Sequence, residues 1–419
     1  MRQYNKIADA DYLRLKANYL SDENLLEDFF EEESRQGKSP ENYFVYTHRG
    51  VGYSADLLLQ TRLNDFFDTV ERIPQFSFDV MRQEIGETFL FYESKSSAAF
   101  LRREFAESAD QNNNYSAFRL DSWHMIYRPS RHFGFLNFIP RGGIRETYFS
   151  KTRKIEYYQG IIQMTNEQGV VTNIVVDKER YIDAGSALRS LPELGCELSY
   201  KAFSTWGEPD FPMRHVIQPY LDYTIIPEPS VKKEELYQFD SIDKIDQTHE
   251  VKIGMRNKYQ TKIDDKASDF ADINTYTIYK IHREEGEDAI SHFYYDAEFD
   301  PLESVKIRSD GIYSLQNSEF EKLNAELQYE SEQMITLHVE YRYLNLKKIS
   351  RLLSTDLTFF EEQPWSFNIF GRYEFEDSHM EEQGGYIQRN YDCLSVRTGY
   401  SILPGYTCLL YTSPSPRDS

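Results

Sequence analysis

Four charged side chains stand at even-numbered positions within one short stretch of the chain, Glu250, Lys252, Arg256 and Lys258. Successive side chains on an extended strand point to opposite faces, so these four share one face. Arginine and lysine match phosphate oxygens well, so the set could bind an anionic, phosphate-bearing ligand. The other interpretation is a wall of paired charges that lines a water-filled lumen, and the sequence leaves both interpretations open.

Two more runs place an arginine on the polar side of a strand. Arg342 lies there in "ITLHVEYRY" and Arg372 in "WSFNIFGRYEFED". The candidates for a charged, lumen-facing lining are therefore Glu250, Lys252, Arg256, Lys258, Arg342 and Arg372.

Other kinds of site have little support. The nine histidines form no HExxH or HxH arrangement, and neither a G-x-S-x-G elbow nor a P-loop occurs, so we expect no metal, no cofactor and no enzymatic activity. We predict that the pairs Gly142–Gly143 and Gly384–Gly385 are turn residues. The net charge is -22 and no basic block stands out, which argues against a nucleic-acid partner.

The elements that carry the charged residues alternate in polarity. In "WSFNIFGRYEFED", Trp365, Phe367 and Ile369 share one side, and the other side is mostly polar. Similar runs cover residues 53–63, 250–260, 292–299 and 335–343. Many of them are longer than the five or six residues of an ordinary strand, and they reach the nine to eleven that cross a bilayer. Polar clusters such as "SADQNNNYS", "TNEQG" and "EEQGG" predict turns and loops between them.

We therefore predict an all-β protein, an antiparallel transmembrane β-barrel of roughly 14–18 strands. The alternatives are another outer-membrane barrel, such as a porin or receptor, and a soluble all-β binding protein. One short helix is predicted in "SDENLLEDFFEEES" near the N-terminus, because Leu25, Leu26, Phe29 and Phe30 recur at spacings of three and four. The start lacks the apolar region of a signal peptide, and we expect it to be internal to a longer gene. Residues 408–419 ("CLLYTSPSPRDS") look like translated sequencing-adapter DNA, which leaves Cys196 and Cys393.

Several segments, in order along the chain, resemble the C-terminal domain of the LptD (organic-solvent-tolerance) family of LPS-assembly proteins. They are "NYLSDENLLEDFFEEE", "NDFFDTVERIPQFSFDV", "RLDSWHMIYRP", "FGFLNFIPRGGIRETYF", "RHVIQPYLDYTIIPEP" and "YQFDSIDKIDQTHEVKIGMRNKYQTK". A later segment, "YDCLSVRTGY", is similar to the family's late cysteine-containing strand, although Leu394 replaces the usual aromatic residue after Cys393.

The resemblance implies an outer-membrane barrel, residues 1–407, that lacks the family's periplasmic jelly-roll domain and ends before the closing strand. It implies that lipopolysaccharide (LPS) arrives from a periplasmic bridge, that its polar head passes through the lumen, and that it leaves laterally into the outer leaflet. The implied partners are LPS, outer-membrane lipid, the periplasmic LPS-transport bridge and a plug lipoprotein of the LptE type. Cys393 could form a disulfide with the missing periplasmic domain.

Overall fold

The computed structural model of the chain is built almost entirely of β-strands. It describes residues 2–20, 41–106, 114–165, 171–208, 211–263, 266–283, 286–331, 334–345, 349–361, 363–391, 395–403 and 406–411. One sheet contains 23 strands, and β10 and β11 form a separate two-stranded sheet. In the described part, helical structure is limited to a short 3-10 turn, η2 (Lys233–Glu235), and no helix there could span a bilayer. The all-β, antiparallel prediction is confirmed.

The predicted helix in "SDENLLEDFFEEES" and the cysteine Cys393 lie outside the described residues. The chain divides into two compact units. Unit 1 comprises Met1–Ser130, Ile139–Cys196 and Thr224–His249, and unit 2 comprises Arg131–Phe138, Glu197–Tyr223 and Glu250–Ser419.

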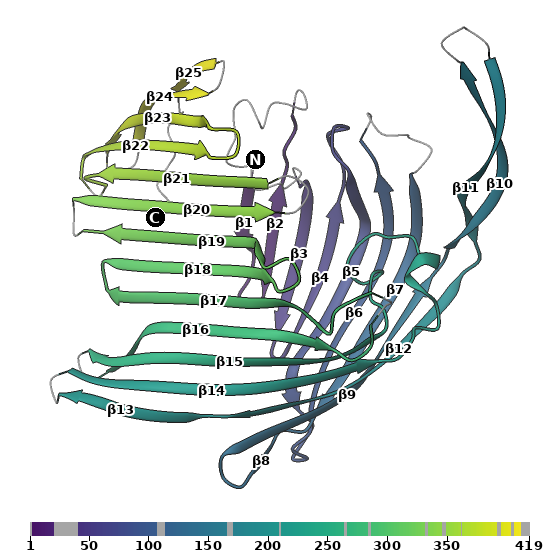
Figure 1. The fold of residues 1–419 in the computed structure, drawn as a ribbon, viewed down its shortest axis with the longest axis horizontal. Helices are drawn as coiled ribbons and strands as arrows, with labels where there is room; N and C mark the ends of the chain where they lie inside the picture. The colour runs from purple at the N-terminus through teal and green to yellow at the C-terminus, as the bar shows by residue number, and fades with distance from the viewer. Residues whose placement is uncertain are drawn as a thin grey trace. The chain divides into compact units, whose positions relative to one another are not determined.

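In unit 1, seven strands pair in chain order, each antiparallel to the next, and two further strands pair with each other in the separate sheet. They are β1 (Arg2–Lys6), β2 (Asp11–Lys16), β3 (Tyr43–Gly50), β4 (Tyr53–Gln60), β5 (Thr69–Glu84), β6 (Phe91–Glu104) and β7 (Tyr115–Tyr127), followed by β10 (Thr152–Thr165) and β11 (Val171–Ala184). Four strands contribute residues to both units, β9 (Leu136–Phe149), β12 (Ala187–Tyr200), β14 (Phe211–Ile226) and β15 (Thr248–Ile263), and the short β8 (Ser130–His132) lies at a boundary. The β10–β11 hairpin is visible as a separate pair of strands in Figure 1.

Connections in unit 1 are short at one end of the strands and long at the other. Residues 51–52 join β3 to β4, whereas residues 61–68 join β4 to β5 and residues 227–247 lead from β14 to β15. This alternation of short turns and longer polar loops agrees with the pattern predicted for an outer-membrane sheet.

Unit 2 is a series of antiparallel hairpins joined mostly by short turns. Figure 1 shows β15 to β23 lying side by side. The strands are β13 (Ala202–Glu208), β15 (Thr248–Ile263), β16 (Lys266–Lys280), β17 (Ile290–Leu302), β18 (Val305–Ser314), β19 (Glu319–Glu330), β20 (Ile335–Asn345), β21 (Ile349–Phe359), β22 (Trp365–Glu374), β23 (His379–Asn390), β24 (Ser395–Leu403) and β25 (Tyr406–Tyr411).

The described residues form 25 strands, more than the 14–18 counted from the sequence. Alternation of polarity reveals a strand only when one of its faces is apolar and the run is long. It therefore misses short pieces such as β8, which has three residues, and β13, whose seven residues are all exposed.

The prediction that the two glycine pairs are turn residues is wrong. Gly142 and Gly143 lie inside β9, and Gly384 and Gly385 lie inside β23, so "EEQGG" is strand as well. A Cβ at Gly143 would collide with the carbonyl oxygen of His124, and one at Gly384 with that of Tyr400. These glycines are therefore explained by the close approach of neighbouring backbone, which is another common use of glycine in a strand.

Candidate functional site

The six predicted lining residues share one face of unit 2. Across the strands, Arg256 is opposite Asn274, Lys258 is opposite Asp272, and Lys252 is opposite Ile278. Following the register from β16 to β22 places Arg342 and Arg372 on the same side as Arg256. We call this side the polar face of unit 2, defined by Glu250, Lys252, Arg256, Lys258, Arg342 and Arg372.

The opposite side of unit 2 is apolar and open to its surroundings. Along β22, Trp365, Phe367 and Ile369 are 46%, 41% and 61% exposed. Large apolar side chains this exposed on a long sheet indicate a surface that meets lipid or another partner.

Two of the basic residues on the polar face are neutralised by carboxylates. The Nζ atom of Lys258 lies 2.9 Å from Asp269 Oδ2 and 2.8 Å from Asp272 Oδ2. Arg372 pairs with Glu382 on the neighbouring strand β23. These pairs correspond to the interpretation of a wall of matched charges.

Lys252 and Arg256 differ, because each lies against a tyrosine ring. Lys252 Nζ is 4.1 Å from the ring centroid of Tyr276, and Arg256 Cζ is 5.3 Å from that of Tyr220. Tyr276 in turn stacks on Tyr294 at 4.7 Å and 8°. Among the residues that the structure describes, no carboxylate lies within ion-pair distance of either cation. Both positive charges are therefore available to an anion.

A glycine makes room for this arrangement. Gly254 lies between Lys252 and Arg256 on the same face, and a Cβ there would enter the ring of Tyr220. The hydroxyl of Tyr220 donates to Asn274 Oδ1 at 3.2 Å, which fixes the ring from its other end. Gly254 is therefore the position at which the tyrosine can lie flat against the strand.

The remaining two predicted residues have more ordinary surroundings. Glu250 is directly across from Lys280 in the β15–β16 ladder. Arg342 lies between Asn324 and Leu352, and its Nε is buried without a hydrogen-bond partner in the described part of the protein.

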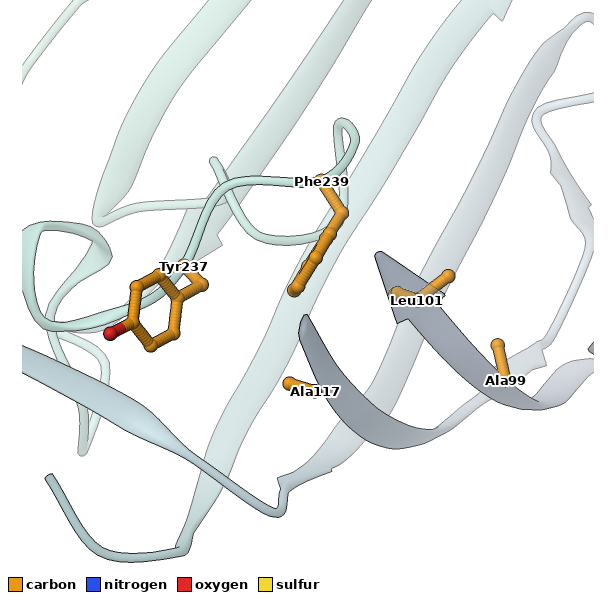
Figure 2. Close-up of a cluster of buried hydrophobic side chains, with 5 residues drawn as sticks. All are labelled: Ala99, Leu101, Ala117, Tyr237 and Phe239. Carbon is orange, nitrogen blue, oxygen red and sulfur yellow. The ribbon is translucent and has the colours of Figure 1, made fainter. Parts of the chain in front are cut away.

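A second cluster, in unit 1, was not predicted from the sequence. Residues 227–247 pack against the face of β6 and β7 that carries Ala99, Leu101 and Ala117. Figure 2 shows Tyr237 and Phe239 projecting from this loop towards those strands. Tyr115 stacks on Tyr237 at 4.7 Å and donates its hydroxyl hydrogen to the carbonyl oxygen of Gln238 at 2.6 Å.

Ion pairs and hydrogen bonds from two arginines also hold residues 227–247 against the strands. Arg119 donates to Asp243 Oδ1 at 2.7 Å and to both oxygens of Asp240, at 2.9 and 2.7 Å. Arg189 donates to the carbonyl oxygens of Ile242, Asp243 and Ile245. We call Arg119, Arg189, Asp240 and Asp243 the loop anchor.

The loop anchor joins segments that lie far apart in the chain and that each resemble the LptD family. Arg119 belongs to "RLDSW", and Asp240 and Asp243 belong to "FDSIDKID". Arg72, from "VERIP", also reaches Asp240, at 3.8 Å. Burial works against ionisation of Asp240, but the hydrogen bonds and charge of Arg119 outweigh it and hold the pKa of Asp240 below its ordinary value.

In the described residues, no group of three His, Cys, Asp or Glu side chains could hold a metal ion. Cys196, in β12, is a free thiol.

The family model described as "LptD: LPS transport system D" matches residues 2–362. The chain belongs to the LptD family. This confirms the resemblance seen in the sequence, places the protein in the outer membrane, and assigns it to LPS transport through a barrel of that membrane. The LptD family is one of transport and assembly proteins and is not known for enzymes.

A search of curated proteins found no match. Among solved structures, the siderophore receptor PirA from Acinetobacter baumannii is similar at 6% sequence identity and a TM-score of 0.38. That match covers 98% of this chain and 68% of the receptor. The LptD match favours LPS transport over the porin or receptor alternative.

Proposed function

We propose that the polar face of unit 2 forms part of the aqueous path along which the LPS head crosses the outer membrane. The observation that carries this proposal is the pair Lys252 and Arg256. Both cations lie on tyrosine rings without a carboxylate partner among the described residues, on the face opposite the exposed apolar side chains.

The chemistry of the cargo suits such a face. LPS carries phosphates on a sugar head and several acyl chains, and burying its polar head in hydrocarbon would cost far too much. A cation held over an aromatic ring keeps its charge and its outward N–H donors, so Lys252 and Arg256 can bind phosphate oxygens. The rest of the path stays hydrated because it is lined by charged side chains, the paired residues Lys258 and Arg372 together with Glu250 and Arg342.

Release follows from the same geometry. The acyl chains leave sideways between strands into the lipid that covers the apolar face. The process requires no covalent chemistry, so the protein acts as a transporter rather than an enzyme. In this proposal, residues 1–407 form one outer-membrane barrel domain, and the adapter-like segment 408–419 follows it, with residues 408–411 extending β25 beside β24.

The proposed partners are a plug lipoprotein of the LptE type and the periplasmic LPS-transport bridge, and Cys393 forms a disulfide with a periplasmic domain. These partners supply LPS to the lumen and occupy part of it.

The test replaces the two unpaired cations. In cells that depend on the full-length protein, the double variant Lys252→Gln, Arg256→Gln should lower the rate at which new LPS reaches the surface, because the path loses both phosphate donors. The matched control is Arg389→Gln, which removes a cation that lies 4.6 Å from the Trp365 ring on the apolar face. Wild-type transport in the double variant, at equal protein levels, would contradict the proposal.

A further inference from the structure

The apolar face of unit 1 contains a pocket that LPS transport along the polar face does not use. Its volume is about 420 Å³. Walls and floor come from β5, β6, β7, β9 and β12 and include Phe76, Phe78, Ser96, Ala98, Leu120, Ser122, Glu146, Tyr148 and Leu188. We call this set the outer furrow.

The outer furrow faces away from the loop anchor. Ala98 and Leu120 are opposite each other in the β6–β7 ladder, whereas the next pair, Ala99 and Arg119, points to the side on which the loop packs. Several side chains around the furrow are exposed, including Phe76 at 50% and Leu188 at 60%. In an outer-membrane protein, an exposed apolar face of this kind meets lipid.

The shape of the furrow suits a hydrocarbon chain. Small side chains, Ser96, Ala98 and Ser122, form the floor, and Phe76 and Phe78 stand on one side of them. Tyr148 and Leu188 stand on the other side. A groove of small residues between bulky ones leaves room along the strands for an acyl chain.

One row of the furrow is polar. In the ladders, Ser96 is opposite Ser122, and Ser122 is opposite Glu146. The hydroxyls of Ser96 and Ser122 lie 2.8 Å apart, and Ser122 Oγ lies 2.8 Å from His124 Nε2. The partner of His124 Nδ1 is the Tyr92 hydroxyl at 2.6 Å, not a carboxylate, so we assign no serine nucleophile here.

Glu146 is the charged member of this row. The Ser190 hydroxyl donates to its Oε1 at 2.6 Å, and no cation lies within ion-pair distance of it among the described residues. A carboxylate without a counter-ion on a lipid-facing surface is costly, and a cationic ligand would remove that cost. The ligand must therefore combine a positive charge with an acyl chain.

We propose that the outer furrow binds a phospholipid with a primary ammonium head, such as phosphatidylethanolamine. Its ammonium group donates hydrogen bonds to Glu146 and to the hydroxyl of Ser122, and one acyl chain lies along Ser96 and Ala98. A primary ammonium offers three N–H donors, whereas the choline head keeps the charge but has none. The inference rests on the outer-membrane location and not on the proposed path in unit 2.

The test measures lipid retained by the purified full-length protein. The protein is extracted in mild detergent, incubated separately with phosphatidylethanolamine, phosphatidylcholine and phosphatidylglycerol, and analysed by native mass spectrometry. Phosphatidylethanolamine should be retained most, and Glu146→Gln should lower its retention by about tenfold or more, as expected for loss of a charge-assisted hydrogen bond. Glu193→Gln is the control, because Glu193 pairs with Arg141 on the other side of β12.

A second variant tests the site without touching the charge. Ala98→Phe fills the floor of the furrow and should lower retention of the bound phospholipid, with thermal unfolding measured to verify the fold. Equal retention of the three lipids, or unchanged retention in Glu146→Gln, would overturn the proposal and leave only an acyl groove. In a fourth incubation, with LPS, retention of LPS in preference to phosphatidylethanolamine would also overturn it.

Discussion

Arg119 and Asp243 lie 124 positions apart in the chain, yet Arg119 Nη1 is 2.7 Å from Asp243 Oδ1. Their side chains are 2% and 0% exposed. Asp243 also accepts hydrogen bonds from the backbone N–H groups of Phe239 and Asp240. One buried ion pair therefore fixes both the position of residues 227–247 on β7 and the local turn of that loop.

Replacing Arg119 should release this loop. In Arg119→Met, the buried Asp243 and the partly buried Asp240 lose their main partner, and breaking a buried ion pair typically costs about 3–5 kcal/mol. We expect a lower unfolding temperature in detergent and new proteolytic cleavage within residues 227–247. Lys232→Gln is the control, since Lys232 and Glu228 form a pair more than half exposed and worth little. Equal cleavage of both variants would show that the ion pair does not hold the loop.

The contribution of Asp240 to the loop anchor should weaken at low pH, whereas burial raises the pKa of Asp243, which therefore adds no such contribution. The folded-state pKa of Asp240 lies below its ordinary value of about 3.9. Its contribution to stability is therefore fully present above that ordinary value and is lost as the pH falls through the lower folded pKa. Asp240→Asn removes the contribution at every pH, so the stability gap between wild type and variant should be largest near neutrality and close in acid. A gap independent of pH would exclude this role for the Asp240 charge.

Gly254 should tolerate no side chain. A Cβ at this position enters the Tyr220 ring, so Gly254→Ala must displace the tyrosine that lies under Arg256, at a cost of about 1–3 kcal/mol. Gly371→Ala, in another strand of unit 2, has its nearest neighbour at 3.9 Å and should cost much less. Thermal unfolding of both variants measures the difference, and similar midpoints would mean that Tyr220 moves freely.

Neighbouring positions in β22 should respond oppositely to a new charge. Ile369→Lys places an ammonium on the apolar face, where lysine costs about 2–4 kcal/mol near the middle of the bilayer. Phe370→Lys places it on the opposite face, across from Asp356. We expect reduced recovery of Ile369→Lys in the outer-membrane fraction and near-normal recovery of Phe370→Lys. Equal losses would argue that the two faces of β22 do not meet different surroundings.

The faces of the strands could be predicted from the sequence because alternation is a local property. In the strand register, the polar side of β22 that carries Arg372 continues through Arg342 to Arg256. Which of these charged side chains have an ion-pair partner could not be predicted from the alternation. Whether Lys258 is paired depends on Asp269 and Asp272 across the turn, and whether Arg256 is free depends on Tyr220 in β14.

The loop anchor could not be predicted from local patterns. Its ion pairs join β7 to a loop more than a hundred positions later, and no spacing in "FDSIDKID" identifies Arg119 as the partner. The prediction that the glycine pairs are turn residues is wrong for a related reason. The sequence shows that Gly384 and Gly385 lack side chains but not that the Tyr400 carbonyl and the Asn368 carbonyl lie where a Cβ would be.

LPS in transit should contact the polar face of unit 2. A photoreactive amino acid placed at position 256 or at position 255, on the opposite face, tests it in cells given a short pulse of labelled LPS precursor. We expect crosslinks to labelled LPS from position 256 that appear early and fade during the chase, while those from position 255 rise only as product accumulates in the membrane. Absence of early crosslinks from position 256, with transport intact, would contradict it.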